Sequence, residues 1–293
     1  MKIKAILGAM AFAVAFSASA AQPKVIAHRG YWDTPGSAQN SIRALVKADS
    51  IGVYASEFDV WMTADSVLVV NHDPSYNGVV IETSPASVVT AQKLANGENL
   101  PTLEQYLKAS LSLKTRLVLE LKSHNSLAHE RQAIKQILEM VKEFGLGNRI
   151  DYITFSPTGF LELTKKAPKP AEVYYLSGNM VPEQIKFLKA KGIDYSLKAM
   201  KKHPWWIPEC HNLGLEVNVW TVNKPEDMKW CIDNKVDYIT TNDPEGLQAM
   251  LAGKCPKCTD DKKCAADKKC AADKKCAADK KCADKKQNKK SKK

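Results

Sequence analysis

Short apolar runs alternate with amphipathic stretches through the middle of this chain, and this alternation restricts its fold more than any other feature. Eight runs have the length and composition of buried β-strands, at residues 24–27, 56–61, 116–121, 152–155, 172–176, 193–197, 216–222 and 237–240. Amphipathic stretches after most of them predict helices, at residues 40–48, 127–144, 157–166, 182–191, 204–213, 225–234 and 244–251. Repeated strand–helix units form a parallel sheet, and eight of them close into a (β/α)8 barrel, the TIM-barrel fold of the α/β class.

Proline and glycine mark where the predicted helices begin and end. Proline is the first residue of five of them, and Gly145, Gly192 and Gly214 each stand just past a helix end. The stretch between the second and third predicted strands is longer than one connection needs. We expect a hairpin strand at 67–71, then a small loop insertion over the barrel mouth at 74–100, and then a helix that begins at Leu103.

Both ends of the chain are expected to lie outside this barrel. Residues 1–20 carry two lysines, an apolar run and then Ala18-Ser19-Ala20, a pattern typical of a secretory signal peptide that is cleaved after Ala20. The alternative is a retained membrane anchor, which the shortness of the apolar run disfavours. The mature protein is therefore expected in a bacterial periplasm or in the medium.

Residues 255–293 form a low-complexity tail rich in cysteine and lysine. Three copies of Ala-Ala-Asp-Lys-Lys-Cys run from Ala265 to Cys282, and the tail holds 15 Lys against 6 Asp. The whole chain has a formal net charge of +11, so the tail and the two lysines of the signal peptide account for all of it. The barrel domain at residues 21–254 is therefore neutral, which argues against nucleic acid as a partner.

The role of the tail stays open between two interpretations. Six of the eight cysteines lie in it, which favours a thiolate site for a soft metal such as Cu(I) or Zn, or a set of disulfide handles in an oxidising compartment. Its lysines would also suit an anionic envelope surface. The other interpretation is a solvated extension without a binding role, because a segment with so few apolar residues is predicted to be disordered in isolation.

Charged side chains stand near the ends of the first predicted strands, where apolar core residues would be expected. Residues two apart in a strand share a face, so Glu57 and Asp59 point the same way. Barrel active sites lie at the C-terminal ends of the strands, so side chains at these ends are expected to converge. The candidate site residues are His28, Arg29, Glu57, Asp59, His72, Glu120 and Lys122, with Trp220 near the end of the seventh strand.

These residue types suit the metal-assisted cleavage of a phosphodiester. Three carboxylates prefer a hard divalent cation, Mg2+ or Ca2+, over a soft metal. Arg29 and Lys122 would hold phosphate oxygens and offset the charge that develops in the transition state. The imidazoles of His28 and His72 can move protons at neutral pH, so that one deprotonates the nucleophile while the other protonates the leaving alkoxide.

Several residues also have a purely structural interpretation. Lys122 fits an ion pair with Glu120, and Trp220 fits either barrel packing or contact with the substrate. Trp205-Trp206 either lines the barrel mouth or starts a helix. The remaining histidines are interpreted as surface or packing residues: His124, His129, His203 and His211.

Short motifs follow one another in a defined order across residues 24–252. They are His28-Arg29-Gly30, Asn40-Ser41, Glu57-x-Asp59, Thr63-x-Asp65, His72-Asp73, Pro101-Thr102-Leu103-Glu104, Glu120-x-Lys122, Val-Trp-Thr-Val-Asn at 219–223 and Thr-Asn-Asp-Pro at 241–244. This series resembles the glycerophosphodiester phosphodiesterase family, which has a TIM barrel like that of the phosphatidylinositol phospholipases C.

The resemblance implies roles for five of the candidate residues. Glu57, Asp59 and Glu120 would be the metal ligands, and His28 and His72 the acid and base. The chain departs from the family pattern at one place, because Gln39 stands where the family commonly has glutamate. A glutamine makes hydrogen bonds but carries no charge, so contacts around the metal site or the substrate hydroxyls are expected to differ there.

Three functions from different classes are compatible with these patterns. The resemblance implies the hydrolysis of glycerophosphodiesters from deacylated phospholipids to glycerol 3-phosphate and an alcohol, a reaction of lipid and glycerol metabolism. A phospholipase-D-like enzyme acting on intact lipids would need an apolar loop beside the mouth, but residues 74–100 are rich in Ser, Thr, Asn and Gly. A non-catalytic envelope or metal-binding protein is disfavoured by the complete set of candidate catalytic side chains.

The division between barrel and tail generates a first prediction. A chain that ends at Lys254 should fold and turn over substrate as the full-length chain does, because the tail adds no apolar surface to bury. The truncation should instead reduce the binding of soft metal ions under reducing conditions. Metal stoichiometry, thermal unfolding and diesterase rate of the two proteins are the measurements, and a truncated barrel that unfolded would show that the tail is part of the enzyme.

Overall fold

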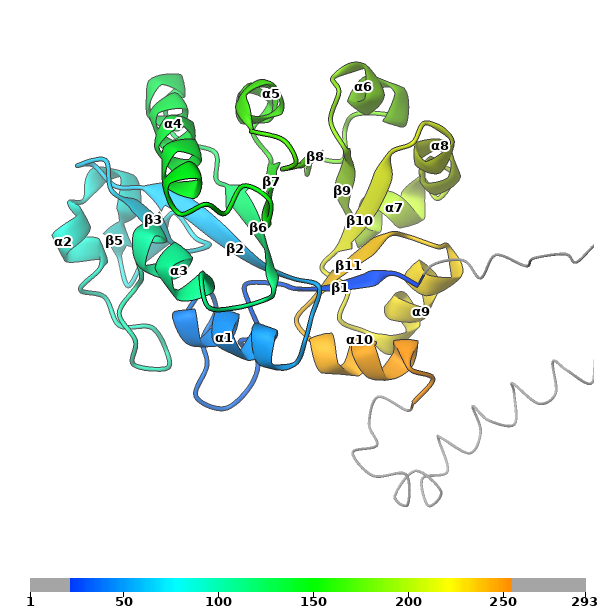
Figure 1. The fold of residues 1–293 in the computed structure, drawn as a ribbon, viewed down its shortest axis with the longest axis horizontal. Helices are drawn as coiled ribbons and strands as arrows, with labels where there is room; N and C mark the ends of the chain where they lie inside the picture. The colour runs from blue at the N-terminus through cyan, green and yellow to red at the C-terminus, as the bar shows by residue number, and fades with distance from the viewer. Residues whose placement is uncertain (1–21, 255–293) are drawn as a thin grey trace, which may run out of the picture.

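The sheet closes into a barrel because its first strand pairs with both the last strand and the second. In this computed structural model, which describes residues 22–254, β1 (Lys24–Ala27) lies parallel to β11 (Tyr238–Thr241) and to β2 (Ala55–Met62). The other strands follow around the ring in chain order, all parallel (Figure 1). They are β6 (Arg116–Leu121), β7 (Ile150–Thr154), β8 (Val173–Tyr175), β9 (Gly192–Ser196) and β10 (Glu216–Trp220). The predicted eight-stranded barrel is confirmed.

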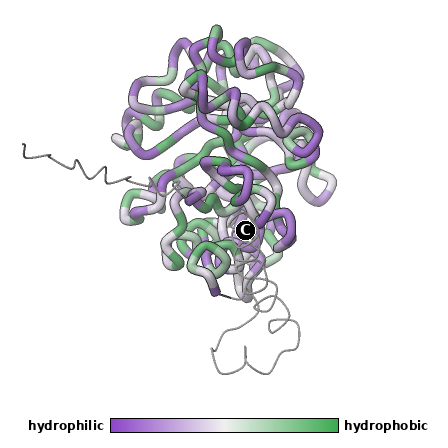
Figure 2. Tube along the Cα trace, turned by 90° about the vertical axis from the view of Figure 1, so that its right-hand side faces the viewer, coloured by the Kyte–Doolittle hydropathy of each residue, from purple (hydrophilic) through white to green (hydrophobic). Residues whose placement is uncertain are grey.

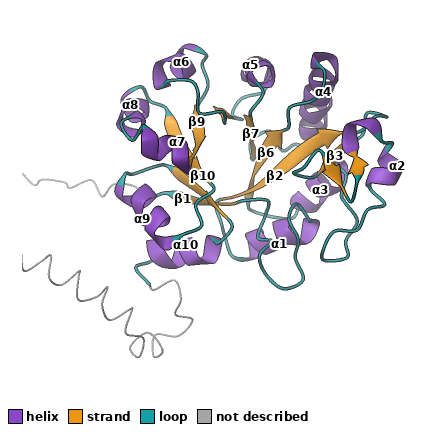
Figure 3. Ribbon diagram, turned by 180° about the vertical axis from the view of Figure 1, so that it is seen from behind, coloured by secondary structure: helices purple, strands orange, loops and turns teal. Residues whose placement is uncertain are grey.

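Helices surround the strands on the outside of the barrel (Figure 3). Ser41, Ser126 and Ser156 each cap the helix that follows by accepting a hydrogen bond from a backbone N–H of its first turn, and four helices begin at a proline, as predicted. The helices of the ring are α1 (Ile42–Ser50), α3 (Leu103–Ser110), α4 (Leu127–Glu143), α5 (Pro157–Lys166), α6 (Pro182–Phe187), α7 (Leu197–Lys202), α8 (Trp206–Asn212), α9 (Pro225–Asp233) and α10 (Pro244–Leu251).

The helices differ from the prediction between β9 and β10. The helix predicted at 204–213 begins at Trp206, and an additional six-residue helix, α7, precedes it. Leu197 was assigned to the strand because it continues an apolar run, but Ser196 accepts a hydrogen bond from the backbone N–H of Ala199 and starts the helix there. A helix of this length carries too little periodicity to be separated from its flanks in the sequence.

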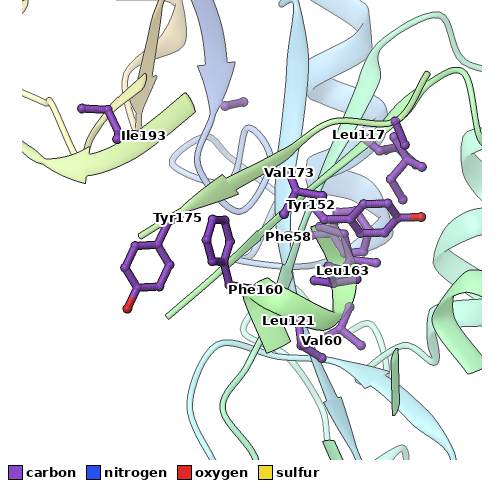
Figure 4. Close-up of a cluster of buried hydrophobic side chains, with 14 of the residues drawn as sticks. Phe58, Val60, Leu117, Leu121, Tyr152, Phe160, Leu163, Val173, Tyr175 and Ile193 are labelled. Carbon is purple, nitrogen blue, oxygen red and sulfur yellow. The ribbon is translucent and has the colours of Figure 1, made fainter. Parts of the chain in front are cut away.

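Each barrel strand presents alternate side chains to two different environments. On β6, Leu117, Leu119 and Leu121 point outward into the main hydrophobic core between sheet and helices. Figure 4 shows part of this core, where Phe160 of α5 packs among strand residues such as Leu121. The intervening residues point into the barrel, where Val118 joins a smaller apolar cluster and Glu120 lies one step nearer the mouth. Because side chains alternate along a strand, the core residues of β6 lie on its outer face and the candidate site residue lies on its inner face.

Gly192 shows how closely two neighbouring strands approach near the bottom of the barrel. A Cβ atom on this residue would lie 1.9 Å from the carbonyl oxygen of Glu216 on β10. Only glycine fits this approach, so β9 begins with a residue that the sequence pattern assigned to a helix end.

The insertion after β2 has its own elements and its own small core. The strand β3 (Leu68–Val70) pairs antiparallel with β2, and beyond it lie β4 (Ser75–Tyr76), β5 (Val79–Val80), a 3-10 turn (Ile81–Thr83) and α2 (Ala86–Val89). Figure 1 shows these elements beside β2 and α3. The predicted hairpin strand and the helix from Leu103 are confirmed. The loop predicted at 74–100 instead contains these short elements, because elements of two to four residues give no periodic signal. Apolar residues of the insertion pack against Trp61 of β2 in a separate small cluster: Val69, Ile81, Val89, Leu94 and Leu100.

Hydrophobic and hydrophilic residues are interleaved along the whole described chain (Figure 2). Within residues 22–254, no helix combines the length and the apolar character that are needed to cross a bilayer. The predicted signal peptide and the predicted cysteine and lysine repeats lie outside the described residues.

Candidate active site

Three carboxylates from two neighbouring strands meet inside the mouth of the barrel. Glu57 and Asp59 point inward from β2, and Asp59 pairs in register with Glu120 of β6. The three residues are only 3%, 1% and 7% exposed, and each offers an oxygen within 4.8 Å of the others. The spacing of two along each strand and the parallel register therefore bring together the carboxylates that the sequence singled out.

The turn after β1 places a backbone donor and a guanidinium against this group. Arg29 and Gly30 both have positive φ, 57° and 77°, so the chain reverses sharply after His28. A Cβ atom on Gly30 would lie 2.6 Å from the Cβ atom of Ala44 on α1, which explains why glycine stands here. The reversal points the backbone N–H of Arg29 at Glu57, whose Oε2 accepts the hydrogen bond at 2.8 Å.

The side chain of Arg29 lies between the carboxylates and Gln39. Its Nη1 donates to Oε1 of Gln39 at 2.5 Å, and its Nε lies 3.8 Å from Oδ2 of Asp59. Gln39, the departure from the family pattern, therefore holds the arginine through a neutral amide. A glutamate there would compete with Asp59 for the same guanidinium charge.

Asp59 is the most heavily paired of the three carboxylates. Asn40 donates to it from Nδ2 at 2.8 Å, and Nζ of Lys122 lies 3.2 Å from Oδ1 of Asp59 and 2.7 Å from Oε1 of Glu120. Burial acts to raise the pKa of Asp59. Lys122, His72 and Asn40 together outweigh burial, so this pKa lies below its ordinary value. Lys122 thus makes the ion pair that the sequence left open, and it bridges two carboxylates.

Glu57 and Glu120 have the opposite balance. Burial, followed by the charge of Asp59, raises the pKa of Glu57 well above its ordinary value and raises that of Glu120 to about 8. Oε1 of Glu57 has no hydrogen-bond partner among the described residues. Carboxylates this close disfavour one another's charge, and a divalent cation between them would remove that cost. An all-oxygen donor set fits Mg2+ or Ca2+.

His28 reaches the same cavity from the end of β1. Its Nδ1 lies 2.7 Å from Oδ1 of Asn242, which also accepts a hydrogen bond from Nε1 of Trp32 at 3.3 Å. An amide oxygen only accepts, so this network assigns the proton of the neutral ring to Nδ1 and leaves Nε2 with a lone pair. Burial, then the charge of Arg29, lowers the pKa of His28 to about 4, which keeps the ring neutral.

His72 faces the cavity from the insertion. The backbone N–H of Asn71 donates to the carbonyl of Asp59 and fixes the chain beside β2. Nδ1 of His72 lies 2.8 Å from Oδ1 of Asp73, a carboxylate that supports a proton on that nitrogen. Burial lowers the pKa of His72 while Asp59 acts in the opposite direction. The two histidines therefore have different partners, an amide for His28 and a carboxylate for His72.

The cavity between the histidines has a volume of about 160 Å³ and an aromatic wall. Trp220 lines it and packs edge-to-face on Phe155, with ring centroids 5.6 Å apart. Nε1 of Trp220 donates to the backbone carbonyl of Asp194 at 2.8 Å. Trp220 thus packs in the barrel and also borders the cavity. Its contact with a substrate stays a prediction.

Histidines and tryptophans outside this cavity have structural partners. His124 accepts a hydrogen bond at Nε2 from the backbone of Met62, and its Nδ1 lies 2.8 Å from the carbonyl of Lys122. His129 pairs with Glu82, His203 stacks on Trp206, and His211 pairs with Asp237. Trp206 is buried at the start of α8 while Trp205 is 52% exposed, and neither lines the cavity. These four histidines either pack or pair at the surface, as the sequence indicated.

Three polar residues around the site had no assigned role in the sequence interpretation. Asn40 holds Asp59, and Asn242 holds His28. Asp194 points inward from β9, is 2% exposed, lines the cavity, and has no hydrogen-bond partner at Oδ1 among the described residues. An aspartate inside an apolar run was the available signal for Asp194. Asn40 and Asn242 lie in motifs, but only the fold shows what each one holds.

Comparisons with known proteins find relatives of this sequence and of this fold. The sequence model of the glycerophosphoryl diester phosphodiesterase family matches residues 28–246. The glycerophosphodiester phosphodiesterase of Caldanaerobacter subterraneus subsp. tengcongensis is 29% identical over 244 residues, which cover 76% of this chain and 95% of that protein. The crystal structure of a glycerophosphodiester phosphodiesterase from Parabacteroides distasonis superposes with a TM-score of 0.78 and 48% identity, covering 79% of this chain and 98% of that chain. An Oleispira antarctica phosphodiesterase in complex with the product sn-glycerol-3-phosphate has the same fold, with a TM-score of 0.67 and 19% identity, covering 79% and 97% of the two chains.

Asp194 generates a prediction about stability and pH. Burial raises its pKa to about 7, only partly offset by a hydrogen bond from Asn218. Between about pH 4 and pH 7 the unfolded chain loses this proton while the folded chain keeps it, so folding stability falls as pH rises, by about 4 kcal/mol. Asp194→Asn removes the ionisation, so the Tm of the variant minus that of the wild type should increase by roughly 8–16 °C from pH 4 to pH 8.

The control for this prediction is Asp233→Asn, which makes the same replacement on the exposed surface of α9. Thermal unfolding followed by circular dichroism at several pH values gives the comparison. A Tm difference for Asp194→Asn that stayed constant with pH would show that the buried carboxyl ionises as easily as an exposed one.

Proposed function

Because the chain belongs to the glycerophosphoryl diester phosphodiesterase family, we propose that it cleaves glycerophosphodiesters to glycerol 3-phosphate and an alcohol by proton transfer between His28 and His72 beside a bound divalent cation. The observation that carries the proposal is the arrangement of three buried carboxylates between two histidines, each with its Nδ1 already held by a partner. This arrangement leaves both Nε2 atoms available to a phosphodiester in the cavity.

Two basic side chains would hold the phosphate. Arg29 lines the cavity, and Lys122 lies beside it between Asp59 and Glu120. The product sn-glycerol-3-phosphate is bound in the Oleispira antarctica phosphodiesterase of the same fold, which supports a small phosphate ester as the ligand here. The charge that develops on the phosphate oxygens would be offset by these cations in a site largely shielded from water.

The family generally depends on a divalent metal ion, and Glu57, Asp59 and Glu120 would hold one in this chain. Mg2+ and Ca2+ both suit carboxylate oxygens. Such an ion would supply positive charge at the nonbridging oxygens of the phosphate. The side chains of the protein orient the substrate and move the protons.

The hydrogen bonds of the two histidines suggest how the protons move. Nε2 of His28, the lone-pair atom of a neutral ring, would accept the proton of the glycerol 2-hydroxyl as its oxygen attacks phosphorus. Nε2 of His72, whose ring is supported by Asp73, would protonate the alcohol oxygen as its bond to phosphorus breaks. Water would then open the cyclic phosphate in the reverse sense, losing a proton to His72 while His28 returns one to the glycerol oxygen.

The cellular setting is part of the same proposal. The signal-peptide pattern supports export to a periplasm or the medium, and deacylated phospholipids are substrates that suit it. The cavity of about 160 Å³ favours a soluble diester over an intact lipid. The tail would bind soft metal ions or anionic envelope surfaces independently of the barrel.

The carboxylate site generates a prediction about metal removal. Excess chelator should lower the hydrolysis rate of glycerophosphocholine by about 100-fold or more, because the charge supplied by the ion is lost. Mg2+ or Ca2+ should restore the rate. Release of glycerol 3-phosphate in a coupled assay is the measurement, and full activity in excess chelator would exclude a metal requirement.

The histidines generate a separate prediction. His28→Ala and His72→Ala should each lower kcat by about 100-fold or more while the fold persists, because each removes a group that moves a proton in the transition state. His211→Ala is the matched control, since this histidine pairs with Asp237 on the outside of the barrel. If either active-site variant kept near-normal kcat, that histidine would not be an acid or base.

A further inference from the structure

A second and larger pocket adjoins the catalytic cavity on the far side of His72. It has a volume of about 560 Å³ and lies between the β1–α1 loop at residues 32–40 and the insertion after β2. Nothing in the motif series assigns a role to it. Of the residues that line it, His72 also lines the catalytic cavity, so the two spaces meet at this imidazole.

The two spaces differ in size, so they suit different parts of a phosphodiester. Pockets that bury a ligand of moderate size have volumes of about 300–1,000 Å³, a range that includes the larger pocket but not the catalytic cavity. The catalytic cavity has room for a compact group such as glycerol phosphate, and the remaining alcohol has to extend out of it. Because His72 would protonate the alcohol oxygen, the space beyond His72 is where the rest of the alcohol would lie.

The walls of the larger pocket combine carboxylates with aromatic rings. Asp33 of the β1–α1 loop and Asp73 of the insertion are both exposed and line it, and Trp32 and Tyr76 contribute two aromatic side chains. No lysine or arginine lines it within residues 22–254. Carboxylates attract a cation from a distance, and aromatic faces attract it in contact through their quadrupole, most strongly when the cation is a weakly hydrated ammonium.

Two basic side chains, Arg29 and Lys47, bond to residues of the pocket wall and not to its carboxylates. Arg29 donates to Gln39 on the wall between the two spaces, and the ammonium group of Lys47 donates to the backbone carbonyl of Pro35. Neither of these two cations pairs with Asp33 or Asp73. One oxygen of Asp73 lies against the ring of His72 instead.

We propose that this pocket, defined by Trp32, Asp33, Asp73 and Tyr76, binds the alcohol portion of the substrate and selects alcohols that carry an ammonium group, such as choline and ethanolamine. The proposal rests on the proposed function, because it places the leaving alcohol beyond His72. A polyol alcohol such as inositol could also stack on aromatic rings, but it carries no charge for the two carboxylates to attract.

The test compares diesters that differ only in the alcohol. For the full-length wild-type protein, kcat/KM should be at least about twofold higher for glycerophosphocholine than for glycerophosphoglycerol. This preference should shrink as the salt concentration increases. Asp33→Asn and Tyr76→Leu should each bring the ratio towards one, whereas Tyr76→Phe keeps the ring and should keep the ratio. Asp233→Asn on α9 is the matched control for the loss of one carboxylate.

The outcomes separate this proposal from the proposed function. Hydrolysis of both diesters with equal kcat/KM, unchanged by Asp33→Asn, would overturn the ammonium subsite and leave the phosphodiesterase intact. A preference for glycerophosphoinositol would replace the ammonium group by a polyol and would also overturn it. If no glycerophosphodiester were hydrolysed at all, the proposed function would fail and the subsite with it. A ratio that falls in Asp33→Asn because kcat/KM drops more for glycerophosphocholine than for glycerophosphoglycerol would support the subsite directly.

Discussion

Three carboxylates held close together out of water carry the electrostatic cost around which this site is built. Removing an ion from water costs several kcal/mol even after the protein relaxes, and like charges nearby add to this. Lys122 and Arg29 supply positive charge to Asp59, and Asn40 supplies a hydrogen bond. This leaves Glu57 and Glu120 with raised pKa values because burial and their neighbours oppose ionisation. A cluster of this kind is poor packing for a core, and a divalent cation bound to it would offset the repulsion between its charges. The chemistry and the instability of the site have the same origin.

The barrel tolerates this cluster because its packing and its chemistry lie on opposite faces of the same strands. The outward residues of β6 join the main core, while Glu120 of the same strand reaches the cavity. Parallel strands all end at one mouth, so residues far apart in the chain converge there without long connections. The sharp turn at Arg29 and Gly30 uses the same geometry to aim a backbone N–H at Glu57. The outer face of the sheet therefore holds the strands in place through the main core, and the site residues on the inner face take no part in those contacts.

The sequence predicted features that depend on hydrophobic periodicity and on the order of strands and helices. It missed features that depend on contacts between residues far apart in the chain. The strands, most helices and the convergence of Glu57 with Glu120 follow from alternation and from the rule that parallel strands end together. The helix α7 and the elements of the insertion were missed because each is shorter than a detectable period. Asn242 was noticed only as part of a motif, because its role is to hold His28, which lies 214 positions away. The larger pocket could not be predicted, since it forms between two loops whose packing no local pattern encodes.

The different partners of the two histidines give the site a direction. His28 lies deeper, and the amide of Asn242 fixes its tautomer without adding charge. His72 lies nearer the surface beside the carboxylate of Asp73, between the small catalytic cavity and the larger pocket. A phosphodiester with its glycerol in the small cavity would have its scissile bond between these two rings. The glycerol phosphate of the substrate would then contact the barrel, while the alcohol would contact the β1–α1 loop and the insertion. Loops accept substitutions more readily than barrel strands do, so such a division would allow alcohol preference to change without disturbing the buried carboxylates.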